Sequence, residues 1–488
     1  MSDGTAAPSR SGGDLKPLRV FLLSLVVVEL FSGVLQVYFI PVYGALAAKF
    51  GVSIGTLSWA LTGFTLATAV STPVFAKLGD VYGHRKILRI EVTIVAIGSV
   101  LIAVAPNFPL LVIGRVLQGM FAAYLPLMFG LVRSRYPHEE TRRAVSYLSS
   151  VLIFGVLAGS VLTGIIARYG NGPGWALWLP AIGTLAGLAG LLIVRGEPAP
   201  ARNAGLRVDW AGAILLAAGL TFVLLALSEG SSWGWGSARV VGFFVGGVVV
   251  LAAWSAVELR TPQPLADLRF MFKPLFLPVY AIGFCTYFGG IGGQVAASTF
   301  MAAPGHVLGY GLSLTPLAIS MSMVPVYFAM FLAVLFTARL GRRIGFRLVM
   351  LIGSIASFVG FGGLIFLHSD LAEFLVTYGI ASVGVGFIES STRTIVVDGL
   401  REGEIAIGEG IYELSITVGA AVGSAVLGAV LSANASKIPG LASQNGYRLA
   451  WLTACLVALV ATVIAAGYAM VEKRSQQASR QTAAAVTN

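Results

Sequence analysis

Long apolar runs recur along nearly the whole of this 488-residue chain and leave little sequence for anything else. A helix needs about 20 mostly apolar residues to cross the hydrocarbon core of a bilayer. Hydrophobic residues make up 57% of the chain, charged residues make up only 11%, and the mean hydropathy is +0.87. The sequence therefore predicts an all-α polytopic membrane protein.

Fourteen runs are long enough to be transmembrane helices, and an even number places both termini on the same side of the membrane. The expected spans are 18–41, 53–76, 88–105, 110–132, 145–168, 176–194, 209–227, 238–258, 275–299, 314–338, 348–367, 372–395, 409–431 and 447–470.

The Lys and Arg residues are distributed unevenly between the two sides of the predicted membrane. Of the 32, 26 fall in loops and tails on one side, five fall on the other side, and Arg115 lies inside a run. Short cytoplasmic loops are rich in Lys and Arg, so we expect both termini to be cytoplasmic in a cell inner or plasma membrane. Contacts with anionic lipids explain the net charge of +11 better than nucleic acid does. The five exceptions are Lys49, Arg168, Arg239, Lys437 and Arg448.

Two segments that contain prolines, 195–208 and 259–273, bracket the seventh and eighth runs. Without that pair, six runs precede and six follow, as in a duplicated six-helix unit. We therefore predict two six-helix halves of a duplicated bundle plus two extra central helices. The expected division is a cytoplasmic N-terminal tail (1–17), an N-terminal six-helix bundle (18–194), a linker with two extra transmembrane helices (195–274), a C-terminal six-helix bundle (275–470) and a cytoplasmic C-terminal tail (471–488).

The two predicted halves share a short motif after their second run. Residues 77–86 read Lys-Leu-Gly-Asp-Val-Tyr-Gly-His-Arg-Lys, and residues 339–347 read Arg-Leu-Gly-Arg-Arg-Ile-Gly-Phe-Arg. Both contain a basic residue before Leu-Gly, then a second glycine, then another basic residue. A shared motif at matching places supports an internal repeat.

The chain resembles the major facilitator superfamily, specifically its fourteen-helix drug–proton antiporters. The first loop motif of that family, Gly-x-Leu-Ala-Asp-Arg-x-Gly-Arg-Lys, is matched at Asp80, Gly83 and Arg85, although Ala76 replaces its first glycine. The fourth-span motif, Arg-x-x-Gln-Gly, is complete at residues 115–119. The resemblance implies transport by alternating access, in which the two halves rock against each other.

Small residues in the fifth run resemble the glycine motif of the antiporter group. The pattern extends from Gly155 to Gly164, with Ser160 where the motif has proline, and Gly419, Gly423 and Gly428 in the thirteenth run have a similar spacing. Small side chains allow helices to approach closely and slide in a membrane. We expect these positions to be helix crossings.

Asp80, Gly83, Arg85 and Glu91 lie at the corner after the second run and are the predicted conformational latch. Orientation by positive charge needs no carboxylate at this corner. Asp80 is therefore expected to bridge to a helix end and hold one conformation. Glu91 is expected to pair with Arg85 or with Arg89.

Glu29 lies near the middle of the first run, and Arg115 lies several residues inside the fourth. A charge in the membrane interior must face a cavity or a counter-charge, so we expect these two residues to face each other. Burial opposes the charged form of the Glu29 carboxyl and the guanidinium favours it. That balance suits proton coupling, with substrate binding and a structural role as alternatives. The first-span acid of the resembled family aligns near Phe31.

The second predicted half has charged residues in its twelfth and thirteenth runs. Glu389 and Arg393 are one helical turn apart and are expected to pair. Glu409 is expected to complement a helix N-terminus. Glu413 is a candidate for proton coupling or substrate binding, and Glu389 is a candidate for substrate binding. Three acids near one mouth would attract cations.

Tyr38 and Phe288 are candidate substrate-binding aromatics, although either can equally face lipid. The four histidines are scattered in loops, and the sequence has neither a metal-ligand spacing nor a phosphate-binding Gly-Lys-Ser/Thr loop. We therefore expect no enzyme activity, no metal site and no cofactor, with the proton gradient as the energy source.

These features together predict a secondary active transporter that exports hydrophobic, positively charged drug-like compounds in exchange for protons. Its expected partners are the small-molecule substrate, protons and the lipid bilayer, and we expect a monomer that does not bind nucleic acid. The alternative is a dedicated exporter or flippase of one endogenous metabolite or lipid. A receptor or scaffold without transport is less consistent with charges buried at Glu29 and Arg115.

Overall fold

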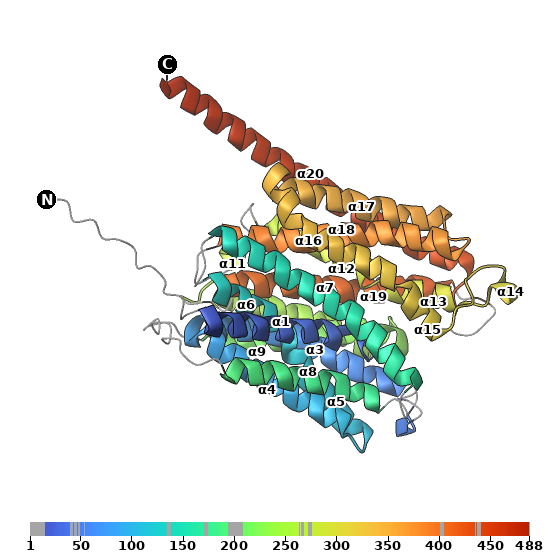
Figure 1. Ribbon diagram of the computed structural model, residues 1–488. Coiled ribbons are helices and arrows are strands. Elements are labelled where there is room, and N and C mark those ends of the chain that lie inside the picture. The colour runs from blue at the N-terminus through green and yellow to red at the C-terminus, as the bar shows by residue number, and fades with distance from the viewer. Residues whose placement is uncertain are drawn as a thin grey trace.

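The computed structural model consists of helices joined by short loops in the part of the chain that it describes (Figure 1). Eleven helices of this part are long and apolar enough to cross a membrane. The chain is therefore an all-helical membrane protein, as the composition predicts. The described residues are 15–39, 42, 46, 49–52, 54–133, 138–169, 174–193, 208–262, 264, 268–271, 276–400, 405–434, 436 and 441–487.

The helices before residue 194 form the first half. Helix α1 packs along α7 and α8, and α4 packs along α5 and α8. The fourth predicted span is divided by a short 3₁₀ turn, η1, between α5 and α6. The bounds are α1 Leu15–Val37, α3 Ile54–Tyr82, α4 His84–Ala103, α5 Phe108–Gly119, η1 Met120–Ala123, α6 Tyr124–Arg133, α7 His138–Tyr169, η2 Trp175–Leu177 and α8 Trp178–Ile193.

The second half begins after a short helix, α11. Helix α18 packs between α16 and α17, and α12 packs along α19 and α20. The bounds are α11 Leu268–Met271, α12 Leu277–Gly290, α13 Gln294–Ala302, α14 Gly305–Leu308, α15 Pro316–Ser322, α16 Val324–Ile344, α17 Phe346–Phe366, α18 Leu371–Gly399, α19 Ile405–Ala433 and α20 Gln444–Thr487.

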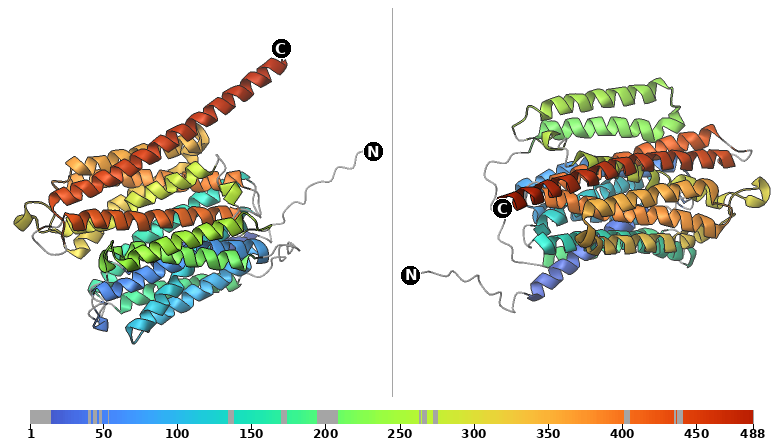
Figure 2. Two further views of the ribbon diagram at one scale, coloured as in Figure 1. Left: turned by 180° about the vertical axis from the view of Figure 1, so that it is seen from behind. Right: turned by 90° about the horizontal axis from the view of Figure 1, so that it is seen from above.

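Two helices between the halves, α9 (Trp210–Trp233) and α10 (Ala238–Glu258), form a hairpin. Helix α9 contacts α3 of the first half and α19 of the second, whereas α10 packs chiefly on α9. In the right panel of Figure 2 the green hairpin lies along one side of the bundle. These helices coincide with the two extra spans expected from the sequence.

Three predicted spans have no counterpart among the eleven apolar helices of the described residues. They nevertheless coincide with helical segments: 18–41 with α1, 88–105 with α4, and 275–299 with α12 and α13. A turn at residues 291–293 separates α12 from α13. The total of fourteen spans stays a prediction.

The two halves pack against each other along two seams. Helix α7 contacts α16 at one seam, and α3 contacts α19 at the other. Phe154 of α7 and Phe331 of α16 have ring centroids 5.9 Å apart. At each seam a helix of the first half packs on a helix of the second half, so any relative motion of the two halves would change these contacts.

Glycines bring helices into backbone contact within each half. A Cβ atom at Gly155 of α7 would collide with the backbone oxygen of Leu30 in α1, and one at Gly423 of α19 would collide with the backbone oxygen of Phe288 in α12. The expectation of helix crossings is therefore confirmed at Gly155 and Gly423, but it is wrong at Gly428, where a Cβ atom would meet nothing within 4 Å. Any side chain at Gly155 or Gly423 would force a pair of helices apart.

The motif shared by the two halves has the same backbone conformation in both. Gly83 has φ 96° and ψ 127°, and Gly345 has φ 88° and ψ 141°. The N–H of Gly83 donates to the oxygen of Gly79 at 2.8 Å, and the N–H of Gly345 donates to the oxygen of Gly341 at 2.8 Å. Only glycine adopts this region without strain, which explains why both halves place glycine there and supports the predicted repeat.

Candidate functional site

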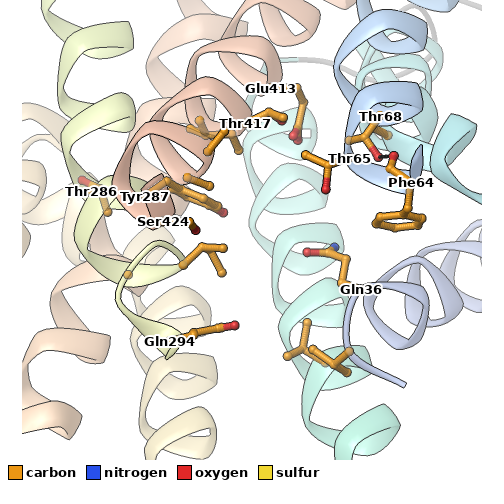
Figure 3. A pocket seen from close by; sticks show the side chains of 18 of the residues that line it. Gln36, Phe64, Thr65, Thr68, Thr286, Tyr287, Gln294, Glu413, Thr417 and Ser424 are labelled. Atoms are coloured by element: carbon orange, nitrogen blue, oxygen red, sulfur yellow. Dashed lines mark hydrogen bonds between the residues drawn. The ribbon is translucent and has the colours of Figure 1, made fainter. Parts of the chain in front are cut away.

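A cavity of about 630 Å³ lies between the two halves. Cavities of roughly 300–1,000 Å³ hold drug-sized molecules. Figure 3 shows polar side chains of α1 and α3 facing those of α12 and α19 across the space. Apolar residues form much of the remaining wall, so the cavity offers both hydrophobic surface and scattered hydrogen-bonding groups. The polar side chains in this view include Gln36, Thr65, Thr68, Thr286, Tyr287, Gln294, Thr417 and Ser424.

The residues that line the cavity extend from the middle of the helices toward the end of the bundle that is opposite the termini. Helix α1 lines it from Glu29 to Val37, and α19 lines it from Glu413 to Gly428. In α1 these residues belong to the part that is farther from the end carrying the termini, and in α19 they extend from the first third of the helix toward the opposite end.

The halves touch where the cavity ends. The hydroxyl oxygens of Ser146 in α7 and Ser390 in α18 are 3.3 Å apart. A Cβ atom at Gly410 of α19 would lie 3.1 Å from the Cβ atom of Ala76 in α3. These contacts close the bundle on the side of the termini.

Arg393 is the centre of a buried charge cluster beside the cavity. Its Nη2 atom lies 2.6 Å from Oε1 of Glu389 and 2.6 Å from Oε1 of Glu413, and its Nη1 atom lies 3.2 Å from Oε2 of Glu409. The side chain of Arg393 is only 1% exposed. The predicted pairing with Glu389 is confirmed, but Arg393 is not one of the loop charges that anchor the chain, because it binds three carboxylates inside the bundle.

Tyrosine hydroxyls bind the second oxygen of Glu389. The hydroxyl of Tyr287 donates to Oε2 of Glu389 at 2.9 Å, and the hydroxyl of Tyr412 lies 3.3 Å from the same atom. Tyr287 lines the cavity, whereas Glu389 lies behind it. The oxygens of Glu389 are occupied by Arg393 and the two tyrosines, and its predicted contact with substrate stays a prediction.

Glu29 of α1 lines the cavity and is 1% exposed. The cation that acts on its carboxylate is Arg393, with Glu413 and Glu389 as neighbouring negative charges. The expected Glu29–Arg115 pair is therefore wrong, although both side chains line the same cavity. Helix α1 instead presents Glu29 to the charge cluster of the opposite half.

Arg115 is held by aromatic faces and an amide. Its guanidinium carbon is 4.0 Å from the ring centroid of Phe64 and 4.6 Å from that of Phe39, and its Nη1 atom donates to Oε1 of Gln118 at 3.0 Å. Tyr38 is fully buried and also donates to this oxygen, at 2.8 Å. Tyr38 is not a lining residue of the cavity, and its hydroxyl is directed to the Arg115–Gln118 pair. Its predicted contact with substrate stays a prediction.

Phe288 was predicted to bind substrate, but it packs away from the cavity. It is 5% exposed and belongs to an apolar cluster with Ala296 and Leu427. The adjacent Tyr287 lines the cavity instead. Consecutive residues of a helix point in different directions, so an error of one residue in the expected orientation of α12 replaces Tyr287 by Phe288 in the cavity wall. A uniformly apolar run gives no pattern from which that orientation can be predicted.

The predicted latch residues surround the start of α4. Oδ1 of Asp80 lies 3.0 Å from Nε2 of His84, one turn along the chain, and Gly83 makes the turn between α3 and α4. Nη2 of Arg89 donates to the backbone oxygen of Leu191 in α8 at 2.6 Å. Burial lowers the pKa of Arg85, which also lies in this corner.

Glu91 does not belong to the latch. Its side chain is fully buried, and its Oε1 atom accepts a hydrogen bond from the backbone N–H of Ala123 at 3.0 Å. The expected pairing with Arg85 or Arg89 is wrong, because Glu91 lies on the inward face of α4. It supports the 3₁₀ turn η1, where the regular hydrogen bonding of the fourth span is interrupted.

The sequence interpretation missed the size of the Arg393 cluster and the roles of Gln118 and Tyr287. A signal was present, since Gln118 is part of the Arg-x-x-Gln-Gly motif and polar residues inside transmembrane spans are rare. Within the described residues, no group of three His, Cys, Asp or Glu side chains is placed to hold a metal ion.

The sequence profile described as Major Facilitator Superfamily matches residues 25–325 and 279–487. The chain belongs to this superfamily. It is therefore a transporter and not an enzyme.

Several relatives within the superfamily have names that refer to resistance or export. The chain is 25% identical to the "Tetracenomycin C resistance and export protein" of Streptomyces glaucescens, over 79% of this chain and 71% of that protein. It is 26% identical to the "Probable actinorhodin transporter" of Streptomyces coelicolor, over 87% and 74%. It is 28% identical to the "Quinolone resistance protein NorB" of Staphylococcus aureus, over 87% and 90%. The resemblance to the drug–proton antiporter group is thus confirmed.

Solved structures of the superfamily share the fold. The human organic anion transporter MFSD10 (TETRAN) matches with a TM-score of 0.65 and 14% identity, covering 92% of this chain and 99% of that chain. A bacterial homologue of the iron transporter ferroportin in an outward-facing state matches with a TM-score of 0.62 and 12% identity, covering 93% and 100%. At these identities the likeness concerns the fold alone.

Proposed function

We propose that this transporter exports hydrophobic, positively charged drug-like compounds in exchange for protons. The observation that carries the proposal is the arrangement of Glu29 and Glu413, which line one cavity from opposite halves and share the positive charge of Arg393. The relatives named for drug, antibiotic and quinolone resistance support export as the direction of transport.

The wall of the cavity favours apolar cations. Phe64, Phe121 and Phe361 are among its hydrophobic lining residues. Glu29 and Glu413 add acidic groups to the same wall, and Glu389 and Glu409 lie directly behind it. Arg393 alone cannot neutralise four carboxylates, and the other cation, Arg115, is bound to aromatic rings and Gln118. A positively charged substrate or bound protons therefore complete the charge balance.

Protons and substrate compete for the same groups in this mechanism. A proton on Glu413 weakens its ion pair with Arg393, and a proton on Glu29 removes the attraction between the two halves. A cationic substrate that approaches these carboxylates favours proton release. Because no state of the transporter binds protons and substrate well at the same time, binding of one favours release of the other. The two species therefore move in opposite directions.

The cavity faces outward if the positive charges hold the termini in the cytoplasm, as we infer from the loop distribution. It then lies on the external side, and the Ser146–Ser390 and Gly410–Ala76 contacts close the cytoplasmic side. Protons from outside reach Glu29 and Glu413 in this conformation.

Proteoliposomes that contain the purified protein test the coupling. The Glu29→Gln variant should lose efflux driven by a pH gradient but retain exchange of substrate down its own gradient, because the amide imitates a protonated carboxyl. Glu140→Gln is the matched control, since Glu140 is an exposed carboxylate at the beginning of α7. Undiminished pH-driven efflux in Glu29→Gln would remove Glu29 from the mechanism.

Two relatives are named for single compounds, tetracenomycin C and actinorhodin, and they support the second candidate, a dedicated exporter of one metabolite. A resistance panel separates the two functions. Overexpression should protect cells against several unrelated cationic compounds if the first proposal holds. Protection against one compound only, with saturable transport of that compound, favours the second.

A further inference from the structure

The α9–α10 hairpin is seated where the two halves separate. Helices α3 and α19 touch near Ala76 and Gly410, at the end that carries the termini. Toward the opposite end both helices line the cavity, and a Cβ atom at Gly428 of α19 would meet nothing within 4 Å. Helix α9 contacts both α3 and α19, so it occupies the opening between them.

Helix α9 contributes directly to the cavity wall. Leu224 and Leu227 line the cavity, and so does Trp235, which follows α9 in the turn toward α10. The wall therefore has a third component besides the two six-helix halves.

The position of Trp235 follows from two glycines. Gly234 ends α9 with φ +84°, a conformation that reverses the chain direction and strains any other residue. A Cβ atom at Gly230 would collide with the indole ring of Trp235 within 2.5–2.7 Å. The ring therefore lies against the bare backbone of α9, with 40% of Trp235 exposed.

The neighbouring Trp233 has a different environment. Its ring centroid is 6.1 Å from that of Trp59 in α3 and 5.8 Å from that of Phe243 in α10. It is not a lining residue of the cavity. Trp233 therefore joins the hairpin to α3, and Trp235 is left facing the space where a substrate would enter.

A polar contact also joins the hairpin to the first half. Oγ1 of Thr62 in α3 lies 3.4 Å from Oε1 of Glu229 in α9, and Glu229 is 5% exposed. Together with the Trp59–Trp233 contact, it connects the outer part of α9 to α3. Two contacts therefore attach the hairpin to α3: the ring contact of Trp233 with Trp59 and the polar contact of Glu229 with Thr62.

We propose that the α9–α10 hairpin is a wall of the substrate cavity that moves with the first half, and that Trp235 contacts the aromatic rings or the positively charged group of the transported compound. This inference rests on the proposed export function. A tryptophan face attracts both flat aromatic rings and cations. Leu224 and Leu227 continue the apolar surface below it, so the hairpin selects compounds that combine a flat ring system with a positive charge.

Transport kinetics in proteoliposomes test the contact. Trp235→Ala should raise the KM for ethidium, a flat aromatic cation, by about 2- to 10-fold, the range expected for one lost aromatic contact. Its kcat should change little, and its KM for tetrabutylammonium, a cation without rings, should rise by a smaller factor, because only the cation–ring attraction is lost. Trp235→Phe should recover part of the affinity for ethidium. Trp233→Ala is the matched control and should not change the ratio of the two KM values.

The outcomes separate the inference from the function on which it rests. If the wild type moves these cations and Trp235→Ala behaves like Trp233→Ala, the hairpin inference is refuted and the proposed function survives. If the wild type moves neither cation nor any other compound of a resistance panel, the proposed function fails and the hairpin contact fails with it.

Cysteine labelling tests the position of Trp235 without any transport. Cys285 and Cys455 are buried, so a Trp235→Cys variant in intact cells should be the main site labelled by a membrane-impermeant maleimide, and ethidium should slow that labelling. Labelling that ethidium does not affect contradicts the contact.

A Thr62→Cys, Glu229→Cys pair joined by a short cross-linker should remain active if the hairpin moves with α3. Loss of activity on cross-linking, restored by reduction, contradicts the shared movement.

Discussion

Replacing Arg393 by methionine tests whether one guanidinium holds the acidic cluster together. The side chain binds Glu389 at 2.6 Å, Glu409 at 3.2 Å and Glu413 at 2.6 Å, and it is 1% exposed. Breaking a buried ion pair by removing one partner costs about 3–5 kcal/mol. The three pairs share one cation, so this range applies to the cluster and is not multiplied by three.

The loss should weaken the contact between α18 and α19, because Arg393 and Glu389 belong to α18 whereas Glu409 and Glu413 belong to α19. About 3–5 kcal/mol corresponds to roughly two to four powers of ten in the unfolding equilibrium. Thermal unfolding in detergent, followed by tryptophan fluorescence, should therefore begin at a clearly lower temperature for Arg393→Met.

A compensated variant separates the charge from the packing. Combining Arg393→Met with Glu389→Gln, Glu409→Gln and Glu413→Gln removes every charge of the cluster, so no uncompensated charge stays buried, and it is this charge that makes a broken ion pair costly. We expect this variant to recover most of the lost thermal stability but no pH-driven efflux. An Arg393→Met protein as stable as the wild type, or a compensated variant no more stable than Arg393→Met, would refute the reasoning.

Two further substitutions examine the helix crossing and the latch. Gly155→Ala should lower thermal stability, because the added methyl group collides with the backbone of Leu30. Gly428→Ala is the control and should be neutral or slightly stabilising, since its Cβ position is empty. Equal melting temperatures of the two variants would contradict a backbone contact between α1 and α7. Asp80→Asn removes the carboxylate that contacts His84. It should lower kcat by about 5- to 30-fold, as expected for about 1–2 kcal/mol, with little change in substrate affinity. Unchanged turnover in a transport assay would show that Asp80 is not a latch.

The sequence was sufficient to predict the helices, the hairpin between the halves and the presence of buried charge. Each of these follows from a feature that is local in the chain: an apolar run, a proline-containing linker, or a charged residue inside a run, as with Glu29 and Arg115. The repeat was also visible, because Gly83 and Gly345 must be glycines for a reason that concerns only their own backbone.

The partners of the buried charges could not be predicted in the same way. Glu29 lies near Arg393 rather than Arg115 because α1 meets the opposite half, and no local pattern records that neighbour. The helices are apolar on nearly every side, so the sequence does not distinguish the face that carries Tyr287 from the face that carries Phe288. Glu91 misled for a related reason, since its position beside a basic corner in the sequence hid its inward direction on α4.

In the proposed exchange with protons, the sharing of Arg393 among three acids has a consequence for the number of protons moved in each cycle. Acidic groups that interact this closely would exchange protons as a set and not as single residues. Substituting Glu389, Glu409 or Glu413 therefore alters proton uptake by the remaining two. The stoichiometry is a collective property, and measuring the charge carried per turnover in each variant will give it more directly than counting carboxylates.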